Sequence, residues 1–198
     1  MKCILFATLF VAAACGGKKP AASPTPVVAK PAEPAPVEKP TPAPPAPKHA
    51  TATMVGTAKF KAVKGTVEFK EVEGGVEVTT KLEGLKKGDH GFHIHEKGDC
   101  TAPDATSAGG HFNPSNHKHG APEAAEHHEG DLGNLTADKA GVATKTFTMK
   151  GITLADGDAS IVGKGFIIHE KADDMKTQPT GNAGARVACG VITLDAAP

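Results

Sequence analysis

The sequence predicts an all-β domain in which eight strands are joined by turns and interrupted by two long functional loops. Short runs of alternating polar and apolar residues begin at about residue 51. The chain of 198 residues contains 23 Gly, only eight Phe, and neither Trp nor Tyr, so Val, Ile, Leu and Ala must fill the core. A composition rich in Gly and poor in aromatic residues favours strands and turns over a helix bundle, and the length suits one domain with appendages.

The clearest strands form a hairpin. Residues 66–70 and 76–79 alternate between polar and apolar side chains around a turn at residues 73–75, which is typical of a hairpin with one face in solvent. The other six expected strands are 54–61, 91–95, 132–137, 142–149, 161–169 and 186–194. Residues 96–131 and 170–185 lack such periodicity, and loops of this length in a compact domain are usually functional.

The first residues have the pattern of an export signal. Met1-Lys2 is followed by an apolar stretch from Ile4 to Ala14, which is too short to span a bilayer, so we expect residues 1–14 to be a cleaved signal peptide. The small residues before Cys15 resemble a bacterial lipoprotein processing site, at which Cys15 would become the lipidated first residue. Ala12 departs from that pattern, which usually has Leu at this position. Ordinary signal cleavage after A-x-A and an uncleaved anchor are the alternatives.

Residues 15–50 are predicted to be a linker between this cysteine and a domain at residues 51–198. Residues 18–48 consist largely of Pro and Ala, a composition that favours an extended polyproline II spacer over a packed structure. We therefore expect a membrane-anchored lipoprotein of the bacterial cell envelope, facing the periplasm or the surface, whose only membrane contact is the lipid on Cys15. A PxxP ligand for a recognition domain is the alternative use of this segment.

The charge distribution argues against nucleic-acid binding. The formal net charge is zero, with six Lys and two Glu in residues 1–49 and 16 basic against 20 acidic residues in the remainder. The domain is therefore acidic, and it lacks the basic stripe that nucleic-acid binding requires.

Four cysteines are present, and no two of them have CxxC spacing. Cys3 and Cys15 lie in the leader region, and Cys100 and Cys189 lie in the domain. In an exported protein the expected use of Cys100 and Cys189 is a disulfide. Two buried free thiols are the alternative.

Histidines provide the strongest functional signal. His93 and His95 flank Ile94 on an expected strand, so both imidazoles lie on the same face. The following loop and a later strand end add more potential ligands: His111, His117, His119, His127, His128, Asp131 and His169. Because neutral imidazole is a preferred ligand of copper and zinc, this gathering predicts a bound transition metal.

Six motifs occur in the order found in one known family. They are Gly91-Phe92-His93-Ile94-His95-Glu96, Gly109-Gly110-His111-Phe112-Asn113-Pro114, Lys118-His119-Gly120, His128-Glu129-Gly130-Asp131-Leu132-Gly133-Asn134, Ile168-His169-Glu170-Lys171-Ala172-Asp173-Asp174 and Gly181-Asn182-Ala183-Gly184-Ala185-Arg186-Val187-Ala188-Cys189-Gly190. Over residues 52–195 the chain resembles the copper–zinc superoxide dismutases, in particular bacterial exported members.

This resemblance implies an eight-stranded antiparallel Greek-key barrel or sandwich and two metals. The implied copper ligands are His93, His95, His111 and His169, and the implied zinc ligands are His111, His119, His128 and Asp131. His111 would bridge both metals, and Asp173 would link His93 to His119 without binding metal. Pairing of Cys100 with Cys189 is also implied.

The activity implied is conversion of superoxide to oxygen and hydrogen peroxide by a copper redox cycle, with zinc as a structural metal. His111 would supply a proton, and the fixed charge of Arg186 would attract the anion. The loop at residues 170–185 is shorter than in the animal enzymes, so steering falls on Arg186 and on Lys171 or Lys176. His117 and His127 fall outside the family pattern and are expected to be solvated, with auxiliary metal capture as the alternative.

Two other functions compete with this prediction. A copper-storage or copper-chaperone domain would typically lack a copper ligand or the arginine, and neither is missing. A binuclear metallohydrolase would need an HxHxDH-like string, whereas His95 is followed by Glu96-Lys97-Gly98-Asp99. The sequence leaves open whether the domain is a monomer or a homodimer.

Overall fold

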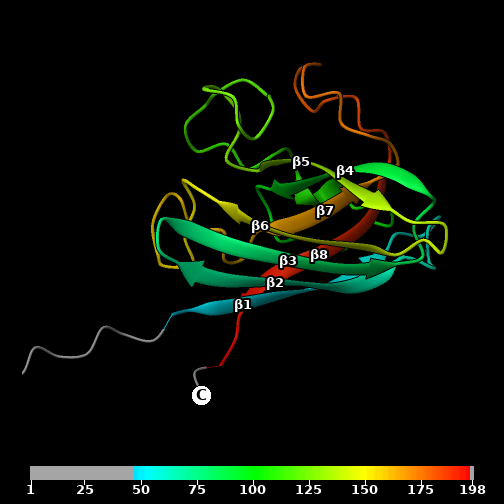
Figure 1. The fold of residues 1–198 in the computed structure, drawn as a ribbon, viewed down its shortest axis with the longest axis horizontal. Coiled ribbons are helices and arrows are strands. Elements are labelled where there is room, and N and C mark those ends of the chain that lie inside the picture. The colour runs from blue at the N-terminus through cyan, green and yellow to red at the C-terminus, as the bar shows by residue number, and fades with distance from the viewer. Residues whose placement is uncertain (1–46, 197–198) are drawn as a thin grey trace, which may run out of the picture. The chain divides into compact units, whose positions relative to one another are not determined.

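The computed structural model describes residues 47–196 (Figure 1). This part of the chain contains eight strands and one short 3-10 helix: β1 (His49–Gly56), β2 (Lys64–Val72), β3 (Gly75–Glu83), β4 (Gly88–His95), η1 (Thr106–Ala108), β5 (Asp131–Ala137), β6 (Ala143–Met149), β7 (Gly165–His169) and β8 (Arg186–Leu194). The all-β prediction is therefore confirmed. The expected signal peptide, Cys15 and the linker up to residue 46 lie outside the described residues. Among the described residues, no helix is long and apolar enough to cross a membrane.

All eight strands form one antiparallel sheet with the order β5-β4-β7-β8-β1-β2-β3-β6. Neighbours that are distant in sequence, such as β3 with β6 and β4 with β7, arise from Greek-key crossovers. The two end strands approach each other, and Lys145 Nζ of β6 donates to Asn134 O of β5 at 2.8 Å. The curled sheet is thus a nearly closed barrel (Figure 1).

Alternating side chains build the core of the barrel. On β2, Val67 and Phe69 are buried between exposed residues, as the period of two predicts. At the centre, the Phe92 ring packs edge-on against Phe147 at 5.6 Å and is tilted against Phe166 at 6.0 Å between ring centroids. These contacts fix β4, the strand that carries His93 and His95.

Several strand boundaries differ from the prediction, and those of the first and seventh strands have clear physical reasons. The first strand is His49–Gly56, not residues 54–61, because its inward positions include Ala50 and Ala52, whose small side chains give a weak hydrophobic signal. After it the chain turns twice, with Phe60 N–H donating to Thr57 O at 2.8 Å and Val63 N–H donating to Phe60 O at 2.9 Å.

The seventh strand begins at Gly165 rather than at residue 161. Lys164 N–H donates to Ile161 O at 3.1 Å, and Gly163 has a φ of 77°. The buried Ile161 therefore belongs to a turn that packs on the core, not to the strand.

The predicted disulfide is confirmed. Cys100 and Cys189 are bonded with a Cα–Cα distance of 5.8 Å across a sequence separation of 89 residues. Around it lies a second small cluster of buried residues, formed by Ala105, Ala108, Ile167 and Cys189. The bond thereby ties the first part of the long loop to β8, the strand that begins with Arg186.

We predict that the Cys100→Ser/Cys189→Ser variant loses about 4 kcal/mol of unfolding free energy, because the bond closes a long loop in the unfolded chain. Urea unfolding of metal-free protein would measure this loss. Reduction of the native protein should reproduce it, whereas adding reductant to the double variant should change nothing. An equal unfolding free energy for oxidised and reduced native protein would contradict the prediction.

Candidate metal centre

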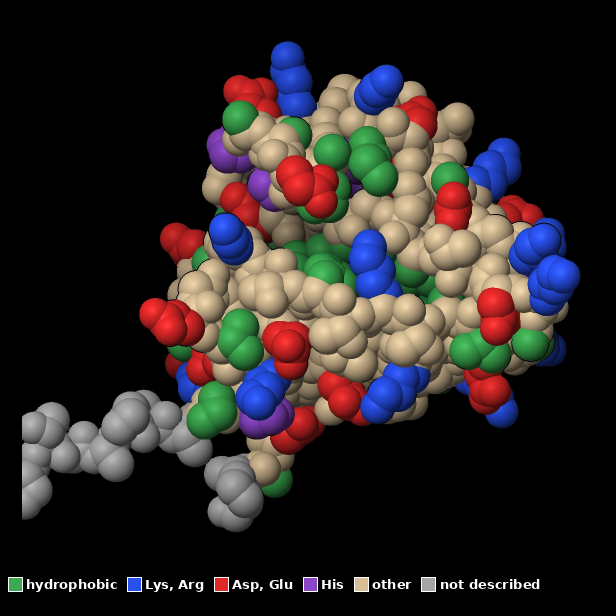
Figure 2. All heavy atoms as spheres, in the orientation of Figure 1, with side chains coloured by type: hydrophobic (Ala, Val, Ile, Leu, Met, Phe, Trp, Pro, Cys, Tyr) green, Lys and Arg blue, Asp and Glu red, His purple; other side chains and the backbone are tan. Residues whose placement is uncertain are grey.

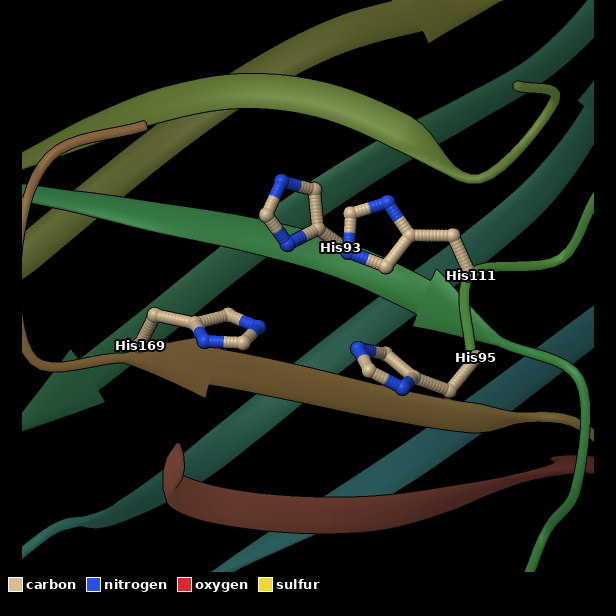
Figure 3. Close-up of side chains that lie close together, drawn as sticks. All are labelled: His93, His95, His111 and His169. Carbon is tan, nitrogen blue, oxygen red and sulfur yellow. The ribbon is translucent and has the colours of Figure 1, made fainter. Parts of the chain in front are cut away.

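Three segments bring four histidines together (Figure 3). His93 and His95 lie on β4 with their rings opposite to the core residues Phe92 and Ile94. His111 is held beside this strand by an isolated bridge between residues 95 and 111, and His169 ends the neighbouring β7. All four histidines are buried.

One nitrogen from each ring faces this common space without a hydrogen-bond partner in the protein: His93 Nδ1, His95 Nε2, His111 Nε2 and His169 Nε2. One donor atom from each residue lies within 4.8 Å of all the others. Buried nitrogens without partners are costly, and their convergence is the arrangement expected of ligands to a transition metal. The group therefore fits a metal ion.

Hydrogen bonds on the opposite side of each ring set its orientation. His95 Nδ1 lies 2.9 Å from Gly109 O, and His169 Nδ1 lies 3.2 Å from Gly184 O. Because a carbonyl oxygen only accepts, both Nδ1 atoms carry the proton, and both Nε2 atoms keep a free lone pair.

Burial keeps these rings neutral. It lowers the pKa of His169 to about 3 and that of His111 to about 4, and it holds the pKa of His95 well below the usual value. Neutral imidazole is the form that binds metals, so at neutral pH the group is ready for an ion without losing protons.

A second group shares His111. Asp131 Oδ1 lies 2.7 Å from His111 Nδ1, 2.9 Å from His119 Nδ1 and 3.3 Å from His128 Nδ1. His128 Nδ1 and His111 Nδ1 are 3.4 Å apart. Ligands about 2.0 Å from a tetrahedral zinc ion stand roughly 3.3 Å from one another, so these separations match a closed three-His, one-Asp site.

Asp131 is anchored as well as shared. Its Oδ2 accepts hydrogen bonds from Gly120 N–H at 3.1 Å and His128 N–H at 2.9 Å. Burial would raise the pKa of Asp131, but hydrogen bonds from the three histidines outweigh it and hold the pKa far below the usual value. The carboxylate is thus permanently charged and fixed in place.

Asp173 connects the two groups from behind. Its Oδ2 lies 2.7 Å from His93 Nε2 and its Oδ1 lies 3.0 Å from His119 Nε2. Burial lowers the pKa of His119, but hydrogen bonds with Asp131 and Asp173 outweigh it and raise the pKa to about 9. A metal that binds His119 Nδ1 must therefore displace a proton from this ring.

Arg186, at the start of β8, lies beside the first group. Its Nη1 donates to Ala105 O and its Nη2 donates to Gly109 O, both at 2.6 Å. The guanidinium charge contributes to the lowered pKa of His95 and of His169, which places the charge near both rings. Gly109 O is the same atom that accepts from His95 Nδ1.

Sequence reasoning missed three residues that hold the site together. The Asn134 side chain bonds Asp173 twice, donating to its carbonyl at 2.9 Å and accepting from its N–H at 2.7 Å. The Gln178 side chain likewise accepts from His119 N–H at 2.9 Å and donates to His119 O at 2.8 Å. Gly181 has a φ of 67°, and a Cβ there would lie 2.6 Å from His119 Nε2. The family motifs that contain Asn134 and Gly181 were the available signals for two of them; Gln178 had none.

We predict that Gln178→Ala lowers the unfolding free energy of metal-free protein by about 1–2 kcal/mol, because the peptide of His119 loses both partners. The matched control is Lys176→Ala, an exposed residue of the same loop, which should change stability by less than about 0.5 kcal/mol. Urea unfolding of both variants measures the difference. Equal stability of the two would mean that the amide does not support His119.

Comparison with known proteins agrees with this geometry. The sequence profile of the family described as copper/zinc superoxide dismutase matches residues 63–192. The extracellular superoxide dismutase [Cu-Zn] of Drosophila melanogaster is 48% identical over 123 residues, which cover 59% of this chain and 67% of that protein. Superoxide dismutase [Cu-Zn] A of Xenopus laevis is 51% identical over 121 residues, covering 58% and 78%.

Among solved structures, the clock protein EA4 superposes with a TM-score of 0.69 at 37% identity, covering 76% of this chain and 97% of that one. The profile match spans the segment that carries both groups of histidines and Asp131. The chain belongs to the copper/zinc superoxide dismutase family.

Proposed function

We propose that this protein converts superoxide to oxygen and hydrogen peroxide, with copper on His93, His95, His111 and His169 and zinc on His111, His119, His128 and Asp131. The observation that carries the proposal is the shared imidazole: His111 Nε2 belongs to one buried group and its Nδ1 to the other. A single ring that belongs to both groups supports two metals side by side. Family membership supports copper and zinc as their identities.

Bound copper would supply the one-electron redox chemistry that dismutation needs, and zinc would supply a fixed positive charge. The protein holds four lone pairs toward the first metal, with His95 and His169 locked in one tautomer by backbone carbonyls. Asp173 fixes the tautomer of His93 through a hydrogen bond and also bonds His119. It therefore holds the two groups in a constant position relative to each other.

His111 is the residue suited to move a proton. Its Nδ1 stays fixed in the second group, 2.7 Å from Asp131, while its Nε2 faces the first group with no partner in the protein. Nε2 has one lone pair, so it would hold a proton close to the reacting anion only while it is not bound to the first metal, and the fixed Nδ1 would keep the ring in place during that time. Peroxide formation consumes protons, which gives this position its catalytic value.

Arg186 is suited to bind the anion. Its two hydrogen bonds to Ala105 O and Gly109 O leave the guanidinium with further donors, and they aim its charge toward His95 and His169. A fixed cation beside the first group would attract superoxide and orient it there.

Copper binding without turnover is the competing function. Metal analysis of the purified protein, paired with an assay of superoxide consumption, separates the two. One copper, one zinc and rapid consumption support the dismutase. One copper per chain, with superoxide consumed no faster than in buffer alone, would favour copper storage.

We predict that three substitutions separate the two sites. His169→Ala should abolish dismutation and lose copper while zinc stays near one per chain, because His169 lies only in the first group. Asp131→Ala should lose zinc first, since it removes the only anionic ligand. His111→Ala should reduce both metals.

The measurement is the copper and zinc content of each variant after loading with both ions. His49→Gln is a suitable control, since His49 is an exposed histidine outside both groups. If His169→Ala loses as much zinc as copper, or if Asp131→Ala keeps full zinc, the two sites are not separate as proposed.

The same protein is proposed to be exported and anchored in the bacterial cell envelope by a lipid on Cys15. The sequence of residues 1–15 supports this, and the Cys100–Cys189 disulfide fits an oxidising compartment outside the cytosol. An extracellular relative in Drosophila melanogaster fits export as well.

We predict that Cys15→Ser releases the protein from the membrane fraction, because lipidation requires the thiol. Cys3→Ser, a second leader cysteine, is the matched control and should leave the protein in the membrane fraction. Fractionation of cells and immunoblotting measure the distribution. Equal membrane retention of both variants would show that the anchor lies elsewhere.

A further inference from the structure

Two histidines of the long loop remain outside both groups of metal-binding residues. His117 is exposed, as the sequence predicted, but His127 is half-buried. We propose that His117, His127 and Glu129 form a third site, which binds a divalent transition metal such as Zn²⁺ on the outer side of the loop. This site goes beyond the dismutase function, and its three side chains belong to neither of the two buried groups.

Two stretches of the loop run side by side and bring these residues together. His117 Nδ1 lies 3.3 Å from His127 O, and Ser115 Oγ donates to Glu129 Oε1. Asn113 fixes the first stretch, since its side chain both accepts from His117 N–H and donates to His117 O at 2.9 Å. These side-chain contacts hold residues 115–117 beside residues 127–129.

All three side chains line one cavity of about 660 Å³ between this loop and the β5–β6 edge. The floor is apolar and includes Leu132, Phe147 and Met149. Figure 2 shows a hollow with a hydrophobic floor on this face, below a loop that carries histidine side chains. The space is large enough to admit a hydrated cation and to let His117 turn inward.

Two side-chain atoms of the residues that line this cavity are buried and have no hydrogen-bond partner in the protein. They are His127 Nδ1 and Glu129 Oε2. Leaving such atoms unsatisfied is costly, so a ligand that binds both is favoured. An imidazole nitrogen and a carboxylate oxygen together are typical zinc ligands.

The nearby ammonium group does not satisfy the carboxylate. Lys145 also lines the cavity, but its Nζ donates to Asn134 O at 2.8 Å and lies over the Phe92 and Phe147 rings. Glu123 adds a second carboxylate to the lining. The mixed imidazole and carboxylate character of the cavity favours a borderline cation over an anion.

The third site differs from the buried groups in being open. In each buried group the donor atoms all lie within 4.8 Å of one another, whereas those of the third site do not. The exposed ring of His117 must turn to complete it. Binding is therefore expected to be weaker and faster to exchange than at the two buried groups.

The test starts from protein fully loaded with copper and zinc and measures uptake of further Zn²⁺ by equilibrium dialysis. We expect one additional equivalent. His117→Gln/His127→Gln should weaken this uptake at least about tenfold, the loss expected when metal ligands are removed. His49→Gln, an exposed histidine on β1, is the matched control and should bind the additional equivalent normally.

A second measurement does not depend on the variants. In the loaded protein with copper kept reduced, added Zn²⁺ should shift the imidazole NMR signals of His117 and His127 but not that of His49. The proposal is overturned if no third equivalent binds, if the double variant binds it as the native protein does, or if the signals of His117 and His127 do not move. Activity and the two buried metals, measured on the same samples, show independently whether the proposed dismutase function holds.

Discussion

The structure depends on placing the seven side chains of the two proposed metal sites in one buried region without leaving their charges and lone pairs unbalanced. Burial of unpaired polar atoms is expensive, and here four ring nitrogens have no partner in the protein. One metal ion bound by these four nitrogens, as proposed above, would remove this cost. The other nitrogen of each ring is held by a backbone carbonyl, by Asp173 or by Asp131, so binding energy would not be lost in reorienting the rings.

The barrel strands supply rigidity and four of the seven proposed ligands, and the long loop supplies the other three. β4 presents His93 and His95 with a fixed spacing because its other face packs Phe92 and Ile94 into the core. The loops are less regular, and each is fastened to the barrel by a different device. A disulfide ties residue 100 to β8, and the amide of Asn134 ties Asp173 to β5.

Much of the fold and of the candidate site could be predicted from the sequence, because both leave a hydrophobic periodicity or a recognisable motif. The alternation of His93 and His95 with apolar residues is a local signal, and the all-β class follows from similar alternation elsewhere. The first strand was misplaced because Ala50 and Ala52 are inward-facing but scarcely hydrophobic. Gln178 could not be found, since its role is a contact with His119 across 59 residues of chain that no local pattern encodes. The half-burial of His127 likewise depends on the packing of a loop without periodicity.

A single backbone oxygen, that of Gly109, fixes both His95 and Arg186. Gly109 O accepts from His95 on one side and from Arg186 on the other. The geometry of a metal ligand and the position of the guanidinium charge therefore have a common origin. A substitution that shifts this part of the loop would move the His95 ring and the Arg186 guanidinium together. Evolution therefore cannot adjust the position of the charge that attracts the substrate without also changing the orientation of His95.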